Sequence, residues 1–123
     1  MLSRLLKERI YGLRVLYEPE DAEAFVDIIL IHGLFGHAYR TWYQGDQKVF
    51  WPEKLLSDDF PRARIMTFGY DADVTNFFGA VGHGRLRDHA EGLLNDLVNR
   101  RSKIDPVRPL SMKCQCVSFN GKV

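Results

Sequence analysis

The residues of this chain with the clearest chemical meaning are two histidines and two glycines that follow an apolar run. Residues 28–31 are aliphatic, and residues 32–37 read His-Gly-Leu-Phe-Gly-His. Glycine allows backbone conformations and close approaches that other residues avoid, so the N–H groups of such a loop can point at a developing negative charge. The segment therefore predicts an oxyanion-stabilising loop for acyl-transfer chemistry. Its members are His32, Gly33, Leu34 and Gly36.

A second group of polar residues follows the apolar run 63–68. Asp71 and Asp73 lie there, but two loop carboxylates without a third ligand are typical of turns and caps rather than of a metal site. The glycines within residues 79–84 match neither of the two common phosphate-binding glycine patterns. The sequence therefore predicts no metal and no cofactor.

Three strands and two helices are expected to position these loops. The sequence predicts strands over residues 12–17, 25–31 and 63–68, because these runs are apolar or β-branched and end at turn residues. It predicts a short helix over 52–56, with a proline in its first turn, and a long helix over 85–101. The alternation of strand, loop and helix is typical of an α/β fold with a parallel sheet and flanking helices.

Parallel sheets bind ligands outside the carboxyl ends of their strands. The loops after Ile31 and Phe68 both leave from such ends, so they are expected to face each other across one crevice. The side chains that could line this crevice are Phe35, Trp42, Tyr70 and Asp71. Trp42 and Tyr70 could equally fill the core, and His37 is expected to be a polar loop residue.

The apolar residues of the segment 85–101 recur at the three-and-four spacing of an amphipathic helix. This face is expected to pack on the sheet. Its members are Leu86, Ala90, Leu93, Leu94, Leu97 and Val98.

Composition and charge exclude several classes of function. The 123 residues carry 17 Lys and Arg against 16 Asp and Glu, a net charge of +1, which argues against a nucleic-acid-binding arm. No run reaches the roughly 18–20 apolar residues of a membrane span. Residues 1–9 are expected to form a surface helix rather than a signal peptide. Cys114 and Cys116 stand too close for a relaxed disulfide, and two thiols alone make no zinc site, so a reducing compartment is expected.

Residues 28–37 resemble the oxyanion loop of α/β-hydrolase lipases and esterases. Further features recur in the same order in the lipase-like serine-active-site-containing proteins of the fungal type: Trp42, 50–52, 65–71 and the helix over 85–101. The resemblance covers residues 12–109. It implies an α/β-hydrolase fold, serine esterase or lipase activity, a lipid or ester substrate, and the Leu34 N–H as the oxyanion donor.

The resemblance stops where that family places its nucleophile. A Gly-x-Ser-x-Gly elbow is expected after the strand that begins at residue 109, but Ser118 lacks both flanking glycines, and all four histidines precede it. The sequence therefore predicts the N-terminal portion of an α/β-hydrolase, truncated before the elbow and without a catalytic residue. Its expected parts are an N-terminal amphipathic segment (1–11), a partial hydrolase domain (12–110) and a divergent tail (111–123).

Three functions remain open on the sequence alone. The first is an inactive portion of a serine hydrolase; the second is a non-catalytic binding module in a lipid or signalling context; the third is catalysis by the chain itself through Ser111 or Ser118. Because the central sheet would be incomplete, the strand ending at Ile31 is expected to lack a neighbour.

The expected partner is a lipid or ester small molecule, without nucleic acid and with peripheral membrane association allowed. An intracellular location is expected, in the cytoplasm or, by resemblance, at mitochondrial or endoplasmic-reticulum membranes. The sequence does not fix the oligomeric state.

Overall fold

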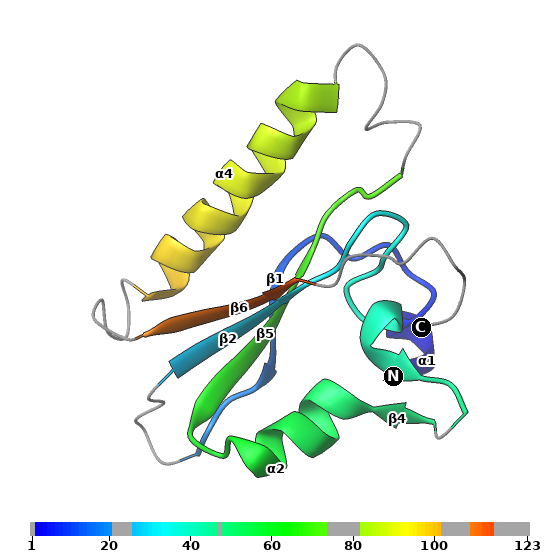
Figure 1. Ribbon diagram of the computed structural model, residues 1–123, viewed down its shortest axis with the longest axis vertical. Helices are drawn as coiled ribbons and strands as arrows, with labels where there is room; N and C mark the ends of the chain where they lie inside the picture. Colours follow the sequence, from blue (N-terminus) through cyan, green and yellow to red (C-terminus); the bar gives the residue numbers. More distant parts are fainter. Residues whose placement is uncertain (1, 21–25, 47, 74–81, 102–108, 115–123) are drawn as a thin grey trace.

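The computed structural model describes residues 2–20, 26–46, 48–73, 82–101 and 109–114. A four-stranded sheet in the order β1-β5-β2-β6 forms its centre (Figure 1). Its strands are β1 (Gly12–Tyr17), β2 (Val26–Ile31), β5 (Ala63–Gly69) and β6 (Leu110–Cys114). Strands β2, β5 and β6 run parallel, whereas β1 is antiparallel to β5. The predicted α/β fold is confirmed, and the three predicted strands agree with the structure to within one residue.

Both faces of this sheet are covered, which explains the continuous apolar runs. All residues of β5 are buried. Ile29 and Met66 belong to a cluster under helix α4 (Gly82–Arg101), on one face. Leu30 and Ile65 belong to a second cluster, under the short elements that follow β2. A strand buried on both faces shows no polar alternation, and the sequence has none here.

Several short elements build the layer over this second cluster. They are η1 (Arg40–Trp42), β3 (Tyr43–Gln44), β4 (Val49–Phe50), η2 (Pro52–Leu56) and α2 (Ser57–Asp59). The predicted helix over 52–56 is therefore confirmed, and it continues to Asp59.

The N-terminal segment forms only one short helix, α1 (Leu2–Leu5). Leu5 and Leu6 pack against the second cluster, so the apolar side of this segment is attached to the domain. In the part of the chain that the structure describes, no helix combines the length and the apolar character that crossing a bilayer requires.

The expectation that β2 lacks a neighbour is wrong. Strand β6 pairs with β2 in parallel, from Asp27 opposite Leu110 to Ile31 opposite Cys114. The ladder groups of β2 therefore have a partner strand on either side. The predicted boundary between residues 110 and 111 stays a prediction, and β6 crosses it; Cys116 and Ser118 lie outside the described residues.

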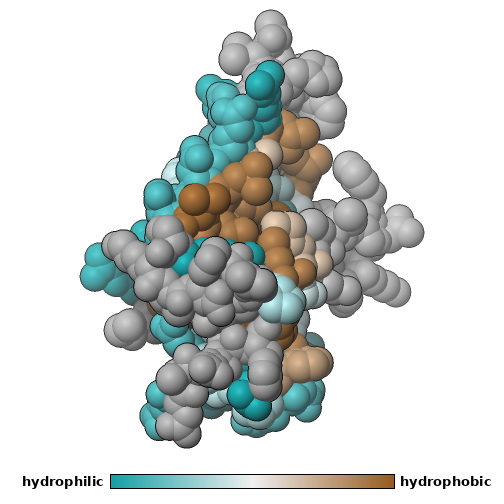
Figure 2. All heavy atoms as spheres, turned by 90° about the vertical axis from the view of Figure 1, so that its left-hand side faces the viewer, coloured by the Kyte–Doolittle hydropathy of each residue, from teal (hydrophilic) through white to brown (hydrophobic). Residues whose placement is uncertain are grey.

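The long helix begins earlier than expected, at Gly82 rather than residue 85, and its apolar face is only partly buried. Leu93 and Leu97 pack on the sheet, but the side chains of Leu94 and Val98 are 55% and 64% exposed. The expectation that the whole face is core is wrong for these two residues and also for Leu86 and Ala90, which are exposed, because α4 touches the sheet along one narrow stripe. Figure 2 shows exposed hydrophobic surface on this side of the molecule.

A buried ionic cluster ties the helix to the sheet. The Asp27 carboxylate is fully buried and accepts two hydrogen bonds of 2.9 Å from the Arg64 guanidinium. The Arg101 Nε, at the end of α4, donates a third hydrogen bond of 2.9 Å to the same carboxylate. Arg64 is itself 1% exposed and also lies 3.8 Å from a Glu18 carboxylate oxygen. The cluster therefore fixes the C-terminal end of α4 against the N-terminal end of β2.

Candidate functional site

The loop after β2 makes a tight turn across residues 33–36. The Gly36 N–H donates to the Gly33 carbonyl at 2.9 Å, and Phe35, the third residue of the turn, has φ +59°. A positive φ at this position is the mark of a type II turn, which normally carries glycine or asparagine there. The turn therefore places its strained residue at Phe35, whose side chain is 62% exposed.

The two glycines of the turn do not have the unusual backbone dihedral angles that the sequence suggested. Neither Gly33 nor Gly36 has a positive φ. A Cβ on Gly36 would lie 2.7 Å from both the Gly33 carbonyl oxygen and the His32 Cβ. Gly36 is thus required for close approach of the chain to itself rather than for an unusual dihedral angle.

The loops after β2 and β5 meet, as the fold argument predicts. The His32 and Tyr70 rings stack with centroids 4.3 Å apart, and the Tyr70 hydroxyl donates to the His32 carbonyl at 2.8 Å. The Phe35 N–H donates to the Ala72 carbonyl at 3.0 Å. These contacts attach the turn firmly to the second loop.

Both nitrogens of His32 are used inside this junction. The Tyr70 backbone N–H approaches Nε2 at 3.3 Å, so Nε2 is an acceptor and Nδ1 carries the proton. Nδ1 then donates to the Gly33 carbonyl at 3.0 Å. Burial lowers the pKa of His32 below its ordinary value; the bond to Gly33 opposes this shift, and the neighbouring His37 adds to it. A buried neutral imidazole with both nitrogens occupied is a structural group, not a general base.

The protonation of His32 leads to a pH-dependent stability. Because folding lowers its pKa below 6.5, the unfolded chain binds the proton more tightly, so the free energy of unfolding falls as the pH drops below that value. The His32 contribution is fully present above the unfolded pKa. Denaturant melts from neutral pH to about pH 5 should show a steeper loss of stability in the unmodified chain than in His32→Gln. Equal slopes in the two proteins would contradict this assignment.

Two hollows flank the turn. The smaller one, of about 160 Å³, is lined by residues of both loops, among them His32, Tyr70 and Asp71. The larger one, of about 710 Å³, lies between the turn and strand β3 and is lined by Gly33, Tyr43, Trp51 and others. Phe35, Gly36 and Arg40 border both hollows. Three of the four predicted lining residues, namely Phe35, Tyr70 and Asp71, therefore lie around the crevice.

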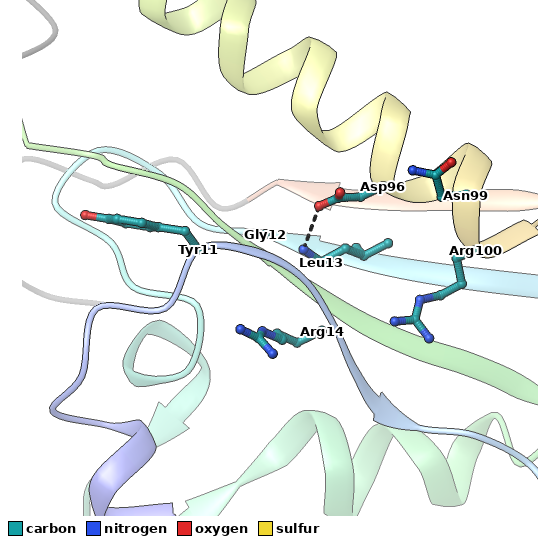
Figure 3. A pocket seen from close by; sticks show the side chains of 7 residues that line it. All are labelled: Tyr11, Gly12, Leu13, Arg14, Asp96, Asn99 and Arg100. Atoms are coloured by element: carbon teal, nitrogen blue, oxygen red, sulfur yellow. Dashed lines mark hydrogen bonds between the residues drawn. The ribbon is translucent and has the colours of Figure 1, made fainter.

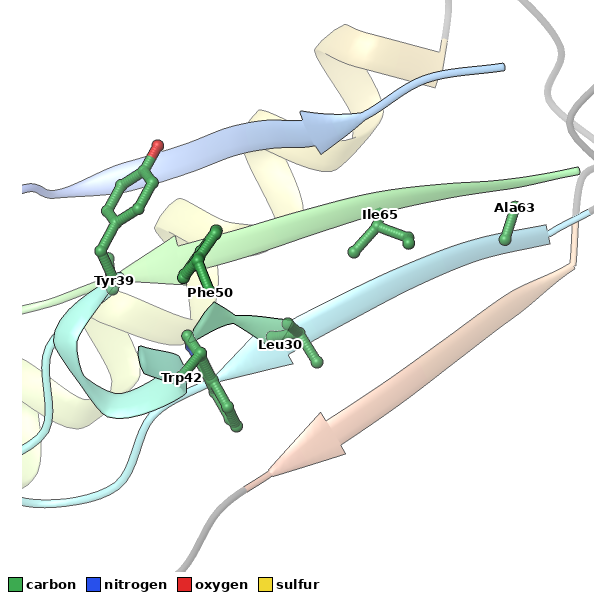
Figure 4. Packing of buried hydrophobic residues seen from close by; sticks show 7 residues of the cluster. Leu30, Tyr39, Trp42, Phe50, Ala63 and Ile65 are labelled. Atoms are coloured by element: carbon green, nitrogen blue, oxygen red, sulfur yellow. The ribbon is translucent and has the colours of Figure 1, made fainter. Parts of the chain in front are cut away.

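Trp42 does not line either hollow. Its side chain is 2% exposed and lies among the residues of the second cluster (Figure 4). It meets Trp51 edge to face, with centroids 5.8 Å apart. The sequence leaves open whether Trp42 lines the crevice or fills the core, and the structure places it in the core.

The Leu34 N–H differs from the two N–H groups that follow it in the turn. The N–H groups of Phe35 and Gly36 both donate within the protein, whereas within the described residues no hydrogen bond involves the Leu34 N–H. The side chain of Leu34 is partly buried. The Gly33 N–H likewise makes no hydrogen bond among the described residues, and Leu34 itself lines neither of the two hollows.

His37 supports the turn from the other side. Its Nδ1 accepts the backbone N–H groups of Tyr39 and Arg40, each at 3.1 Å, at the start of η1. Nε2 must therefore carry the proton, and it donates to the Glu8 carbonyl. His37 connects the N-terminal segment, the loop and η1, in agreement with its expected role as a polar loop residue.

The two loop carboxylates form a turn. The Asp73 N–H donates to the Asp71 carboxylate at 3.2 Å, and Asp71 lies 3.8 Å from the Arg85 guanidinium. Among the described residues, no group of three or more His, Cys, Asp or Glu side chains is placed to hold a metal ion. Of the glycines within residues 79–84, Gly79 lies outside the described residues, and Gly82 and Gly84 belong to the start of α4.

Two residues of the smaller hollow were missed by the sequence argument. Arg9 comes from the N-terminal segment and Arg40 from η1, and both border this hollow. No spacing pattern connects them with the loop, because chain folding alone brings them there. Their positions could not be read from the sequence.

The comparisons with known proteins point to one relative. The chain is 30% identical over 66 residues to Protein SERAC1 of Homo sapiens and of Mus musculus, and 33% identical to that of Bos taurus. Each alignment covers 42% of this chain and 10% of the relative, so the match spans about a tenth of these curated proteins. No family model matches the chain, and no solved structure matches it significantly.

Proposed function

We propose that this chain carries the oxyanion-stabilising part of a lipase- or esterase-like α/β-hydrolase. In this proposal, the turn over residues 33–36 holds the charge that develops on the carbonyl oxygen of a lipid or ester. The chain belongs to the lipase-like serine-active-site-containing proteins. It acts inside the cell, at the surface of mitochondrial or endoplasmic-reticulum membranes. The similarity to a segment of SERAC1 and the mostly parallel sheet support this assignment.

The observation that carries the proposal is the Leu34 N–H. An oxyanion hole requires a donor that is fixed in place and not already used. Leu34 meets both conditions, because the N–H groups on its C-terminal side hold the turn while its own donor makes no bond among the described residues. The neighbouring hollow of about 710 Å³ is lined in part by the aromatic rings of Phe35, Tyr43 and Trp51, which suits an apolar acyl chain.

The same 123 residues are proposed to be inactive as an esterase. His32 is occupied by structural hydrogen bonds, and His37 caps η1 through Nδ1. No serine of the sequence stands in a Gly-x-Ser-x-Gly pattern. Oxyanion stabilisation without nucleophile and base leaves only a small part of a serine hydrolase's rate enhancement.

A titration that isolates the Leu34 donor tests the proposal. Proline is favoured at the second position of a type II turn, so Leu34→Pro should keep the turn and remove only the N–H. Leu34→Ala is the matched control, because it shortens the side chain and keeps the donor. The probe is butylphosphonate, a tetrahedral anion with a short alkyl chain, and binding is followed by the backbone amide signals of residues 33–36.

We expect saturable shifts at Leu34 and Gly36 in the unmodified chain and in Leu34→Ala. Affinity should fall about tenfold in Leu34→Pro, which is the value of one hydrogen bond to a charged group. Equal affinity in Leu34→Pro and Leu34→Ala, or no shift at the turn, would refute the oxyanion role.

One observation favours the second candidate, a non-catalytic binding module. Strand β2 has a partner on each side, and both sheet faces carry a cluster of buried residues. The described residues therefore have the interior of a folded domain. In this candidate the larger hollow binds the alkyl chain alone, so shifts would appear at Tyr43 and Trp51 and be the same in Leu34→Pro and Leu34→Ala.

A further inference from the structure

The two N–H groups at the start of the turn differ in the cavity that they can reach. Neither the Gly33 N–H nor the Leu34 N–H makes a hydrogen bond among the described residues. Gly33 is partly exposed and lines the larger hollow of about 710 Å³, whereas Leu34 lines neither hollow beside the turn. Of these two donors, the one on Gly33 therefore belongs to a residue that borders a cavity.

The direction of the Gly33 N–H is set by the peptide group that joins His32 to Gly33. None of the described peptide bonds is cis, and in a trans peptide the C=O and the N–H point in opposite directions. The Tyr70 hydroxyl donates to the His32 carbonyl at 2.8 Å, so this carbonyl points toward the loop after β5. The Gly33 N–H consequently points away from that loop.

The positions of the two hollows agree with this direction. His32 and Tyr70 border the smaller hollow but not the larger one, and Gly33 borders the larger hollow but not the smaller one. The peptide group thus lies between the hollows, with its carbonyl on the side of Tyr70. Its N–H is on the side of the larger hollow, where the aromatic rings of Tyr43 and Trp51 lie.

Tyr70 is itself held in place, so its hydroxyl can fix the peptide group. Its ring stacks on the His32 ring, with centroids 4.3 Å apart and an angle of 4° between the ring planes. Its backbone N–H approaches His32 Nε2 at 3.3 Å, and its ring centroid lies 5.4 Å from that of His89 on α4. Contacts from the loop after β2 and from α4 therefore hold the hydroxyl against the carbonyl.

A third hollow, of about 470 Å³ between the start of β1 and the last turns of α4, shows the opposite arrangement. Leu13 lines it, but the Leu13 N–H donates to the Asp96 carboxylate at 3.1 Å (Figure 3). This backbone donor is used within the protein and is not available to a ligand. At the larger hollow beside the turn, Asp46 and Arg40 bring one charge of each sign to the lining, so binding of an anion there depends on the backbone donors.

We propose that the Gly33 N–H is a donor of the oxyanion site and that Tyr70 is the residue that positions it. The inference rests on the oxyanion role proposed above and extends it from Leu34 to the preceding peptide group. A developing negative charge is stabilised best by donors whose orientation is fixed before the reaction. The oxyanion of an ester in the larger hollow accepts from Gly33, and Tyr70 acts through the His32 carbonyl without touching the ester.

Tyr70→Phe isolates the positioning role, because it removes the hydroxyl and keeps the ring and the backbone N–H. Tyr17→Phe is the matched control, since the Tyr17 hydroxyl also donates to a backbone carbonyl, that of Pro61 at 2.9 Å, at the end of the sheet away from the turn. Each ¹⁵N-labelled variant is titrated with butylphosphonate, and the amide signals of Gly33 and Leu34 are followed. Thermal melts verify that each variant is folded.

We expect a saturable shift of the Gly33 amide in the unmodified chain, in Tyr17→Phe and in Leu34→Pro, which lacks the neighbouring donor. Affinity should fall about three- to tenfold in Tyr70→Phe, with a smaller limiting shift at Gly33, while the Leu34 amide still responds. In the absence of ligand, the order parameter of the Gly33 N–H should fall in Tyr70→Phe alone, because only this change frees the peptide group.

The outcomes separate this inference from the oxyanion role itself. A shift at Leu34 without one at Gly33, or equal affinities in Tyr70→Phe and Tyr17→Phe, would overturn the inference and leave the Leu34 donor in place. Absence of any saturable shift at the turn in the unmodified chain would overturn both. If Tyr70→Phe does not fold, the presence or absence of the Gly33 shift in the unmodified chain and in Leu34→Pro still decides whether Gly33 is a donor.

Discussion

Asp27→Asn is expected to reduce the free energy of unfolding by about 3–5 kcal/mol. The substitution keeps the size of the side chain but removes the negative charge that serves both Arg64 and Arg101. Arg64 is 1% exposed, so its positive charge would remain buried with only the more distant Glu18 nearby. An uncompensated buried charge costs far more than a surface ion pair contributes.

Chemical denaturation at neutral pH measures this effect. A loss of this size is comparable with the whole stability of many small domains, so a fraction of the variant should be unfolded without denaturant. Asp88→Asn is the matched control, because Asp88 is exposed on α4 and surface changes stay within about 0.5 kcal/mol. Similar midpoints for the two variants would show that the Asp27 cluster does not hold α4 to the sheet.

Gly69→Ala is expected to destabilise the chain by about 3 kcal/mol or more. A Cβ at this position would lie 1.9 Å from the Ile10 carbonyl oxygen and 2.9 Å from the Ile10 carbonyl carbon. Both are backbone atoms, so no rotamer change can relieve the overlap. The chain entering β1 would have to move away from β5, at the end of the strand that positions Tyr70.

Gly92→Ala is the control for this substitution. Gly92 lies within α4, and nothing stands within 4 Å of a Cβ placed there. Because alanine favours helix more than glycine does, this variant should be more stable by about 0.5–1 kcal/mol. Opposite signs for the two glycine variants in the same melting assay are the expected result. Destabilisation of similar size in both would mean that the close approach of Ile10 to Gly69 is not a constraint.

The sequence predicted those parts of the fold that depend on the hydrophobic pattern of a single segment. β5 is buried along its whole length, so its run of apolar residues identified it directly. The meeting of the two loops followed from the rule that parallel strands end at the same edge, and the stack of His32 on Tyr70 confirms it.

The sequence did not predict the features that depend on contacts between several distant segments. The three-and-four spacing on α4 could not tell that only Leu93 and Leu97 reach the sheet, because the width of a helix contact depends on its crossing geometry. Asp27 interrupts an apolar run, and its partners stand 37 and 74 residues away. No local pattern connects such positions.

The sequence predicted which residues form the turn after β2, but it did not predict what each residue contributes to the turn. The glycines suggested unusual dihedral angles, yet Phe35 has the positive φ and Gly36 supplies space. A turn is defined by the hydrogen bonds around it, and the Ala72 carbonyl that accepts the Phe35 N–H comes from another loop. The resemblance named the Leu34 N–H as a donor, but only the structure shows that it makes no hydrogen bond among the described residues.

The most direct measurement is ester hydrolysis by the homogeneous 123-residue chain, with p-nitrophenyl butyrate as substrate and a fluorophosphonate probe for reactive serines. The account predicts no turnover above the uncatalysed rate and no stoichiometric adduct on any serine, since the proposed function gives the chain a stabilising donor without a nucleophile or a base. Hydrolysis that disappears on the single change Ser111→Ala or Ser118→Ala would contradict it.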